Sequence, residues 1–499
     1  MSDSLELALL IVSGVLVGGG LFAADRRLRW GSILLALLIA FVLVCGLAWD
    51  GPLADLRESP TRLALLAVVG LALLGALAWL FRRHVIALPL LLVAALPFRV
   101  PVELGGDTSN LLIPLYLVIA AAVIAAFWDS VISRKSGPSG LSSRPLDLVL
   151  GAAVILYALQ AIWSVDIPSA AQVVAFFLVP FAALYASLVA IEWRREVVMQ
   201  CLLIVAVQAV LFAAIAIVQA AIGEIFWNPA LIASNDFHLY FRANSLFWDP
   251  NIYGRYLALA LLLGVSCLVW IGDRRRSILF SLGLAFLWVG LLFAWSQSSF
   301  ISLVVGLLVL VALRYDLRWA VVATPIVVLA IFGAVFLGAD RDDSRGAAAA
   351  ATSGRTSLVS GGLALAVDRP LAGWGSGSFS RAFAEREGLD PDQTSVSHNE
   401  AITIAAEQGV LGLAAYALVL LTALWTLFGG LRSLSPGLGG TPPTGGTPLL
   451  TLQARMGLSA GFCLLFAHTM GYAGFLTDPL TWALLALAAA FGGRSLERG

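Results

Sequence analysis

Residues 197–222 read VVMQCLLIVAVQAVLFAAIAIVQAAI, and no side chain in this run carries a charge. A helix needs about 20 mostly apolar residues to cross the ~30 Å hydrocarbon layer of a bilayer, so the run is long enough to span it. Because the run is continuously apolar and does not alternate with polar residues, it does not fit a strand of a membrane β-barrel. The stretch therefore predicts a transmembrane α-helix.

Runs of this kind recur along the whole chain. Of its 499 residues, 60% are hydrophobic and 12% are charged, and the mean hydropathy is +0.94. A soluble domain carries roughly 25% charged residues because its surface faces water. We predict an all-α polytopic membrane protein with about 14–15 transmembrane helices. The apolar segments are expected at roughly 5–24, 31–49, 62–81, 85–97, 110–128, 147–164, 170–192, 197–222, 252–272, 277–295, 299–313, 318–338, 400–428, 455–476 and 479–493.

Basic and non-basic loops alternate along the chain. Arginines gather in every second loop, as at 26–29 and 274–276, whereas the loops between them are acidic, mixed or neutral. Short basic loops stay in the cytoplasm, so the alternation predicts an N-terminus outside and a C-terminus inside. Two of the predicted outer loops are long, at about 223–251 and 339–399. Long loops in compact proteins are usually functional.

The segment Ser397-His398-Asn399-Glu400 stands immediately before an apolar run. Ser-x-x-Glu in this place is typical of a capping box, with Ser397 as the N-cap and Glu400 reaching back to it. His398 would then be the first helical residue, where the positive end of the helix dipole favours a neutral imidazole that accepts a proton. The alternative is a histidine at the membrane surface that only supports the cap.

The same predicted helix carries polar and small residues at defined positions. Asn399 and Glu407 share one face of it. Glu407 lies about 13 Å deeper than His398 at 1.5 Å per residue, so it cannot orient that ring directly. A carboxylate this deep in a span is functional or is held by a partner, and we predict a structural role. Gly409 and Gly412 predict close packing against another helix.

Three arginines stand beside predicted helix starts on the outer side, where the charge rule predicts few of them. They are Arg242, Arg255 and Arg355. Asp249 followed by Pro250 predicts a helix start, which places Arg255 near the outer surface. Arg355 opens an amphipathic stretch that we expect to form a helix on the membrane surface. Arginine is suited to bidentate phosphate binding, although ordinary loop ion pairs would also account for these residues.

Metal chemistry is not expected. Two Asp-x-Asp pairs occur in hydrophilic loops, Asp340 with Asp342 and Asp390 with Asp392. Neither has a histidine or a further carboxylate pattern beside it that would complete a ligand set. We therefore expect neither a metal nor another cofactor.

The sequence from Arg355 to Leu413 resembles the signature region of the O-antigen ligase and O-antigen polymerase superfamily. Members carry a Pro-Leu-x-Gly-x-Gly-x-Gly-x-Phe-like turn, and residues 370–379 here read PLAGWGSGSF. A helix that starts at His-Asn and contains Glu-x-Gly-x-x-Gly follows, as at 398–412. Residues 242–251 read RANSLFWDPN and are similar to the family's Arg-x-x-Gly-x-Phe-x-x-Pro-Asn segment, with serine in place of glycine.

His468 and Asp478-Pro479, near the C-terminal end of the sequence, are also similar to residues that family members carry there. The chain departs from the family pattern in two places. Members often carry a Ser-Arg-Gly-like element where residues 296–299 here read SQSS. Members also commonly have fewer spans. We therefore expect residues 1–84 to form extra N-terminal transmembrane helices and residues 85–499 to form the O-antigen ligase-like membrane domain.

The resemblance implies a GT-C-like membrane fold that transfers a glycan from an undecaprenyl-diphosphate carrier to an acceptor hydroxyl, without a metal. The acceptor would be carried on a lipid or a glycan, at the outer face of a bacterial inner membrane. Cations would stabilise the leaving diphosphate. The implied roles are His398 as general base, with His238 as the next candidate, and Arg242, Arg255, Arg355 and Asn399 as diphosphate-binding residues.

Two alternatives stay open at this point. A polymerase would differ from a ligase only in its acceptor, which one sequence does not identify. A transporter or flippase of lipid-linked glycans would also need many spans, but such proteins usually show internal repeats and polar residues near the middle of the membrane. Because the polar residues here gather in the outer loops and at helix ends, we favour the enzyme over the transporter.

Overall fold

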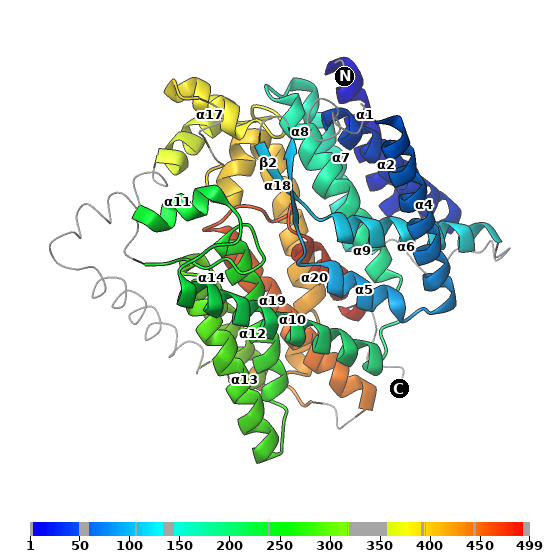
Figure 1. Cartoon of the computed structure of the whole chain (residues 1–499). Coiled ribbons are helices and arrows are strands. Elements are labelled where there is room, and N and C mark those ends of the chain that lie inside the picture. Colours follow the sequence, from blue (N-terminus) through cyan, green and yellow to red (C-terminus); the bar gives the residue numbers. More distant parts are fainter. Residues whose placement is uncertain are drawn as a thin grey trace.

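The structure is a computed structural model that describes residues 3–48, 59–104, 107–132, 144–237, 240–316, 318, 357–390, 394, 396–442 and 446–492. These residues form a bundle of helices with one short two-stranded ribbon (Figure 1). Within them, 11 helices are long and apolar enough to cross a membrane. The predicted all-α, multi-pass membrane fold is therefore confirmed.

The helices follow the predicted apolar segments closely. The longer ones are α1 (Asp3–Phe22), α2 (Arg26–Leu47), α4 (Pro60–Arg83), α6 (Ile113–Ile132), α7 (Pro145–Gln160), α8 (Ile167–Val173) continued through a π-helical turn into α9 (Val179–Val189), α10 (Arg195–Ile222), α12 (Pro250–Leu268), α13 (Arg274–Leu292), α14 (Gln297–Arg314), α18 (Glu400–Phe428), α19 (Gly446–Thr469) and α20 (Pro479–Gly492). The segment predicted at 318–338 lies outside the described residues, apart from Arg318.

The short elements lie between these helices. They are α5 (Ala87–Ala95), α11 (Pro229–Phe237), the helix Ser357–Asp368, α17 (Phe379–Glu387), and the antiparallel strands β1 (Val100–Leu104) and β2 (Asp107–Leu111), in which Val100 pairs with Leu111. The segment predicted at 85–97 thus yields only α5, which is too short to cross a bilayer. The helix at 357–368 confirms the helix predicted after Arg355, which itself lies outside the described residues.

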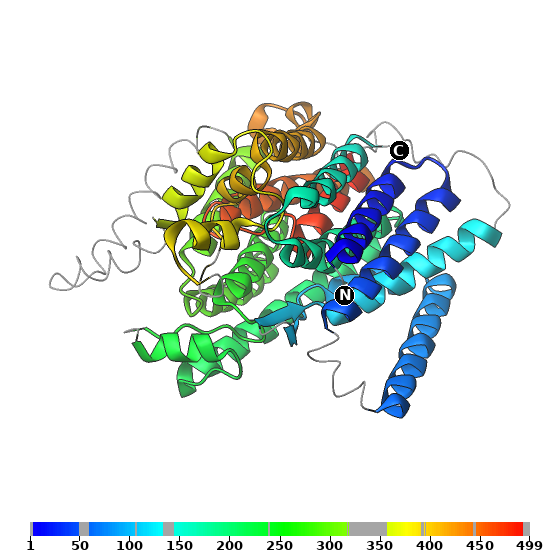
Figure 2. The same cartoon turned by 90° about the horizontal axis from the view of Figure 1, so that it is seen from above.

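The N-terminal helices pack directly against the rest of the bundle. Figure 2 shows α1 and α2 on one side of the molecule and α12 to α14 on the other. Arg29 on α2 forms a buried ion pair of 2.6 Å with Asp147 on α7, and the Tyr185 hydroxyl on α9 donates to the same carboxylate at 2.6 Å. Inside a membrane, polar groups must be satisfied within the protein. This ion pair therefore fastens α2 to α7 and α9, although the domain boundary at residue 84 stays a prediction.

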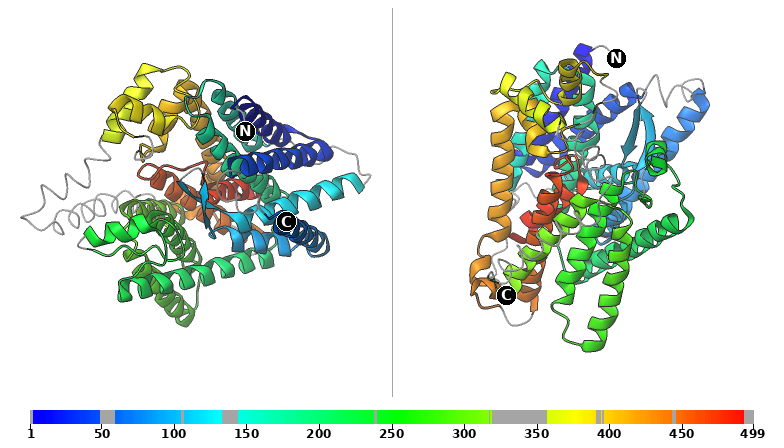
Figure 3. Two further views of the ribbon diagram at one scale, coloured as in Figure 1. Left: turned by 45° about the horizontal axis from the view of Figure 1, so that its top comes forward. Right: turned by 90° about the vertical axis from the view of Figure 1, so that its left-hand side faces the viewer.

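The loops predicted to face outside meet at one end of the bundle. Ser164 donates to Ser376 O at 2.8 Å, and Val165 N donates to Trp374 O at 3.4 Å. Helix α1 begins beside these loops, whereas α20 ends towards the opposite end of the bundle (Figure 3). We call this end the outer end, following the charge rule. Basic loops meet at the other end, where Arg27 Nε donates to Ser130 O at 3.0 Å.

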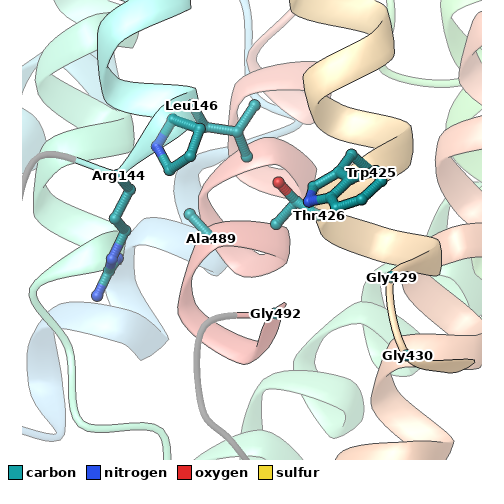
Figure 4. A pocket seen from close by; sticks show the side chains of 9 residues that line it. Arg144, Leu146, Trp425, Thr426, Gly429, Gly430, Ala489 and Gly492 are labelled. Atoms are coloured by element: carbon teal, nitrogen blue, oxygen red, sulfur yellow. The ribbon is translucent and has the colours of Figure 1, made fainter.

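One pocket lies at the end of the bundle opposite the outer end. Arg144, at the start of α7, and Trp425 and Thr426, near the end of α18, line it together with residues of α20 (Figure 4). Because α18 begins beside His398 and ends beside this pocket, the full length of that helix separates the pocket from the predicted site. The predicted site residues therefore do not line this pocket.

Candidate active site

The start of α18 differs from the predicted capping box. The N-cap is Asn399, whose side chain accepts a hydrogen bond from Ile402 N at 3.2 Å. Glu400 does not reach back to Ser397, because its carboxylate accepts from Gly474 N at 2.6 Å, in the loop after α19. The prediction of Ser397 as N-cap, and of His398 as the first helical residue, is therefore wrong. Asparagine is as good an N-cap as serine. The bond between Glu400 and Gly474 therefore decides which of the two residues caps the helix.

Ser397 still supports the turn before α18. Its side chain is fully buried, donates to Asn399 O at 2.7 Å, and accepts from Asn399 N at 3.2 Å. It also lies 2.9 Å from the Thr403 hydroxyl on the first turn of the helix. These bonds hold His398, which stands between Ser397 and Asn399, in a fixed turn.

His398 has a left-handed backbone conformation. Among the described residues, four that are not glycine have a positive φ, and all lie in loops at the outer end: Asn228, Ser245, Trp295 and His398, which has φ 58°. Such residues carry a strain of about 1–3 kcal/mol each and tend to gather at functional sites. The His398 ring is half-buried and lies 6.4 Å, centroid to centroid, from the ring of Tyr472.

Tyr472, in the loop between α19 and α20, connects His398 to the start of α12. Its hydroxyl donates to Asp249, the N-cap of α12, at 3.0 Å. Burial raises the pKa of Tyr472 well above its ordinary value, with a further contribution from the Asp249 charge, so the hydroxyl stays a donor. The guanidinium carbon of Arg255 lies 5.4 Å from the centre of the same ring, and the His468 ring lies 5.9 Å from it.

Arg255, on the second turn of α12, is buried with a carboxylate and a histidine. It is 2% exposed, forms an ion pair with Asp478, and donates from Nε to His468 Nδ1 at 3.2 Å. Because the arginine only donates, Nδ1 accepts and the histidine proton lies on Nε2. That atom faces the hydroxyls of Ser298 and Ser299, each at 3.2 Å. The remaining arginine nitrogen, Nη2, is buried without a hydrogen-bond partner among the described residues.

Arg242 lies on the other side of the serines. It is half-buried, and its guanidinium donates only to neutral oxygens: Ala294 O and Asn251 Oδ1, each at 3.4 Å. Ser296 donates to the same Asn251 oxygen at 2.9 Å. Within the described parts of the chain, no carboxylate lies within ion-pair distance of Arg242. Among the described residues, its charge is therefore not neutralised by a direct ion pair.

The structure thus brings several predicted site residues to one place. His398, Arg242 and Arg255 converge around Tyr472 and the start of α12, and Asn399 lies at the same end, where its side chain donates to Met470 O at 3.2 Å. Arg355 and His238 lie outside the described residues. Tyr472 had no signal in the sequence, whereas the family resemblance had already marked His468 and Asp478.

The glycine-rich turn at residues 370–379 inserts into a break in α18. Trp374 N donates to Ala406 O at 3.0 Å, and Val410 N donates to Pro370 O at 2.8 Å. Between them Gly409 has φ 62° and ψ −157°, a conformation that only glycine adopts readily. A Cβ at Gly409 would come within 2.6 Å of the Leu371 backbone. The partner of Gly409 is therefore this turn and not, as predicted, another helix.

Glu407 holds the turn in place from the same break. It is 7% exposed, and its carboxylate accepts from Gly377 N at 3.0 Å and from Phe379 N at 3.2 Å. This position fits the predicted structural role. At Gly412 the atoms nearest to an added Cβ belong to the Gln408 side chain of the same helix, so the close helix packing expected there stays a prediction.

Glu407→Ala is expected to destabilise the protein in detergent by about 2–6 kcal/mol, because it leaves the N–H groups of Gly377 and Phe379 without acceptors at ~1–3 kcal/mol each. Thermal unfolding of the purified protein measures this. Glu385→Ala, which removes an exposed carboxylate on α17, is the matched control and should stay within about 0.5 kcal/mol of wild type. Normal thermal stability of Glu407→Ala would show that the carboxylate does not hold the turn.

Comparison with known families agrees with this arrangement. Residues 282–417 match the family model described as O-antigen ligase. Residues 282–417 therefore form a region that is similar to O-antigen ligases. The match confirms the resemblance found in the signature region, and it includes the serines of 296–299, the glycine-rich turn and His398. Residues of α12 and the loop after α19 lie outside the matched O-antigen ligase region but complete the site in space. No curated protein matches the chain.

Proposed function

We propose that this membrane protein transfers a glycan from an undecaprenyl-diphosphate carrier to a hydroxyl of a lipid- or glycan-linked acceptor, at the outer face of a bacterial inner membrane. The observation that carries the proposal is the convergence of His398 and Arg242 at one end of the bundle, where no carboxylate among the described residues lies within ion-pair distance of Arg242. The O-antigen ligase match supports the reaction class. A polymerase would use the same residues and differ in its acceptor.

His398 is the proposed general base. It takes the proton of the acceptor hydroxyl as the oxygen bonds to the anomeric carbon of the donor. The bond from that carbon to the diphosphate oxygen breaks, and the diphosphate leaves with the electron pair. The fixed turn between Ser397 and Asn399 supports this role, because a general base acts only from a defined position within hydrogen-bond reach.

Arg242 is the proposed main contact of the diphosphate. A guanidinium whose partners are neutral keeps its full attraction for an anion, and preorganised cations stabilise the charge of the leaving group. Arg255 is compensated by Asp478, so its direct contact with the diphosphate would have to use Nη2. Arg355 enters the proposal on the family resemblance alone, and Asn399 would have to exchange its bond to Met470 O for one to the donor.

Metal independence is part of the proposal. Charge stabilisation by arginine supplies what a divalent cation would otherwise supply to a leaving diphosphate. Among the described residues, no group of three or more histidines, cysteines or acidic residues is placed to hold a metal ion. Asp340, Asp342 and Asp392 lie outside those residues. The requirement is therefore tested by assay in a chelator.

The orientation is tested by labelling single added cysteines in intact cells. A cysteine at Ser234 on α11 should react with an impermeant maleimide, and one at the exposed Thr441, in the loop before α19, should react only after the cells are opened. The protein without an added cysteine is the control, because four native cysteines are present. Labelling of Thr441→Cys in intact cells would reverse the orientation and place the site in the cytoplasm.

A further inference from the structure

Two aromatic side chains lie beside Arg242 at the outer end. The rings of Tyr240 and Trp295 are 4.9 Å apart, centroid to centroid, and are tilted by 32°. Trp295 directly follows Ala294, whose carbonyl accepts from Arg242 Nε at 3.4 Å. Tyr240 is 41% exposed and Trp295 is 52% exposed. The pair therefore offers an open aromatic surface next to the proposed diphosphate site.

The backbone at Trp295 is strained. Its φ is 46°, in the left-handed region, where a bulky residue is a clear outlier and glycine is favoured. A tryptophan that only anchors the protein at the membrane surface needs no particular backbone conformation. Strain of this kind persists where the surroundings impose it, and it gathers at ligand sites. The conformation places the indole ring against Tyr240, one residue before Ser296 of the serine cluster.

We propose that Tyr240 and Trp295 form a stacking platform for the first sugar of the donor, the pyranose ring bonded directly to the diphosphate. The inference rests on the proposed function, since Arg242 holds the diphosphate there. The sugar next to that diphosphate must lie close to Arg242. Trp295 directly follows Ala294, whose carbonyl accepts from Arg242. The C–H face of a pyranose packs on aromatic rings through dispersion and through the negative ring face.

The variant Trp295→Gly tests binding of the donor sugar separately from the stability of the fold. It removes the ring at a position whose φ suits glycine, so the thermal unfolding temperature should equal or exceed that of wild type. Binding of the sugar-bearing donor should weaken by about tenfold, as expected for loss of an aromatic packing partner. Tyr240→Ala should weaken the same binding without changing a strained position. Trp425→Ala removes an indole that is 77% exposed at the opposite end of the bundle and should have no effect.

The experiment compares two probes in nanodiscs: a lipid diphosphate without sugar, and the same lipid diphosphate bearing one pyranose. Wild type should bind the sugar-bearing probe more tightly, and Trp295→Gly should lose that difference while its affinity for the bare probe is unchanged. Equal weakening of both probes would overturn the platform and make Trp295 a membrane anchor. No change in either, or no preference in wild type, would also overturn it. The bare probe tests the proposed function separately, because Arg242→Ala should weaken its binding.

Discussion

His398→Ala is expected to lower the rate of glycan transfer by about 10²–10⁴, or roughly 3–5 kcal/mol of barrier, because it removes the general base. The fold should stay near normal, since the histidine ring is half-buried and alanine, which is not branched at Cβ, can adopt the left-handed conformation at φ 58°. Initial rates of the purified variant and its thermal unfolding in detergent measure both quantities. Raising the pH should not restore the rate fully, because acceptor hydroxyls ionise far above any workable pH.

Ser397→Ala is the matched control for this variant. It removes the hydroxyl that bonds to Asn399 and Thr403 but leaves the imidazole, so it should cost about 1–3 kcal/mol of stability and lower the rate much less than His398→Ala does. If purified His398→Ala transfers glycan within a few-fold of wild type, His398 is a loop residue at the membrane surface. The base would then have to be sought elsewhere, with His238 as the next candidate.

Arg242→Ala is expected to lower kcat/KM for the lipid-linked donor by about 10²–10³, the range seen when one preorganised group that stabilises transition-state charge is lost. Arg242→Lys should recover only part of this, because lysine keeps the charge but loses the planar fork. Steady-state kinetics with varied donor measure the effect.

Arg381→Ala is the control for the arginine variants. Arg381 lies on α17 at the same end of the molecule and is exposed, with a weak pair to Glu385 at 3.8 Å and a hydrogen bond of 3.4 Å from Nη1 to Val165 O. Its loss changes the local charge equally without touching the site, so the rate should stay near that of wild type. An Arg242→Lys protein that turns over like wild type would remove Arg242 from the diphosphate site.

Hydrophobic patterning predicted most of the fold, because crossing a bilayer demands long apolar runs whatever their neighbours. The run predicted at 400–428 coincides with α18, and Asp249 with Pro250 start α12 as predicted. Predictions of local structure were wrong where contacts with residues far away in the chain determine it. Glu400 bonds to Gly474 instead of capping its own helix, and the break at Gly409 exists because the glycine-rich turn enters it.

The site could be predicted only in part. His398 and Arg242 stand in recognisable motifs, so a pattern in the sequence marks them. The cluster that surrounds them depends on contacts between residues far apart in the chain, such as Arg255 with Asp478 and Tyr472 with Asp249. Such pairs cannot be predicted from periodicity or spacing. The neutral hydrogen-bond partners that Arg242 has among the described residues likewise become visible only once the loops are placed.

Reconstitution of the purified protein in liposomes tests the central claim most directly. The donor is an undecaprenyl-diphosphate-linked glycan, candidate lipid and glycan acceptors are supplied, and the buffer contains EDTA. The account predicts a glycosylated acceptor and one released undecaprenyl diphosphate for each glycan transferred, with both lost in His398→Ala. Movement of the donor across the bilayer with no glycosylated acceptor would contradict it and indicate a transporter, and activity that needs added Mg²⁺ or Mn²⁺ would contradict metal independence.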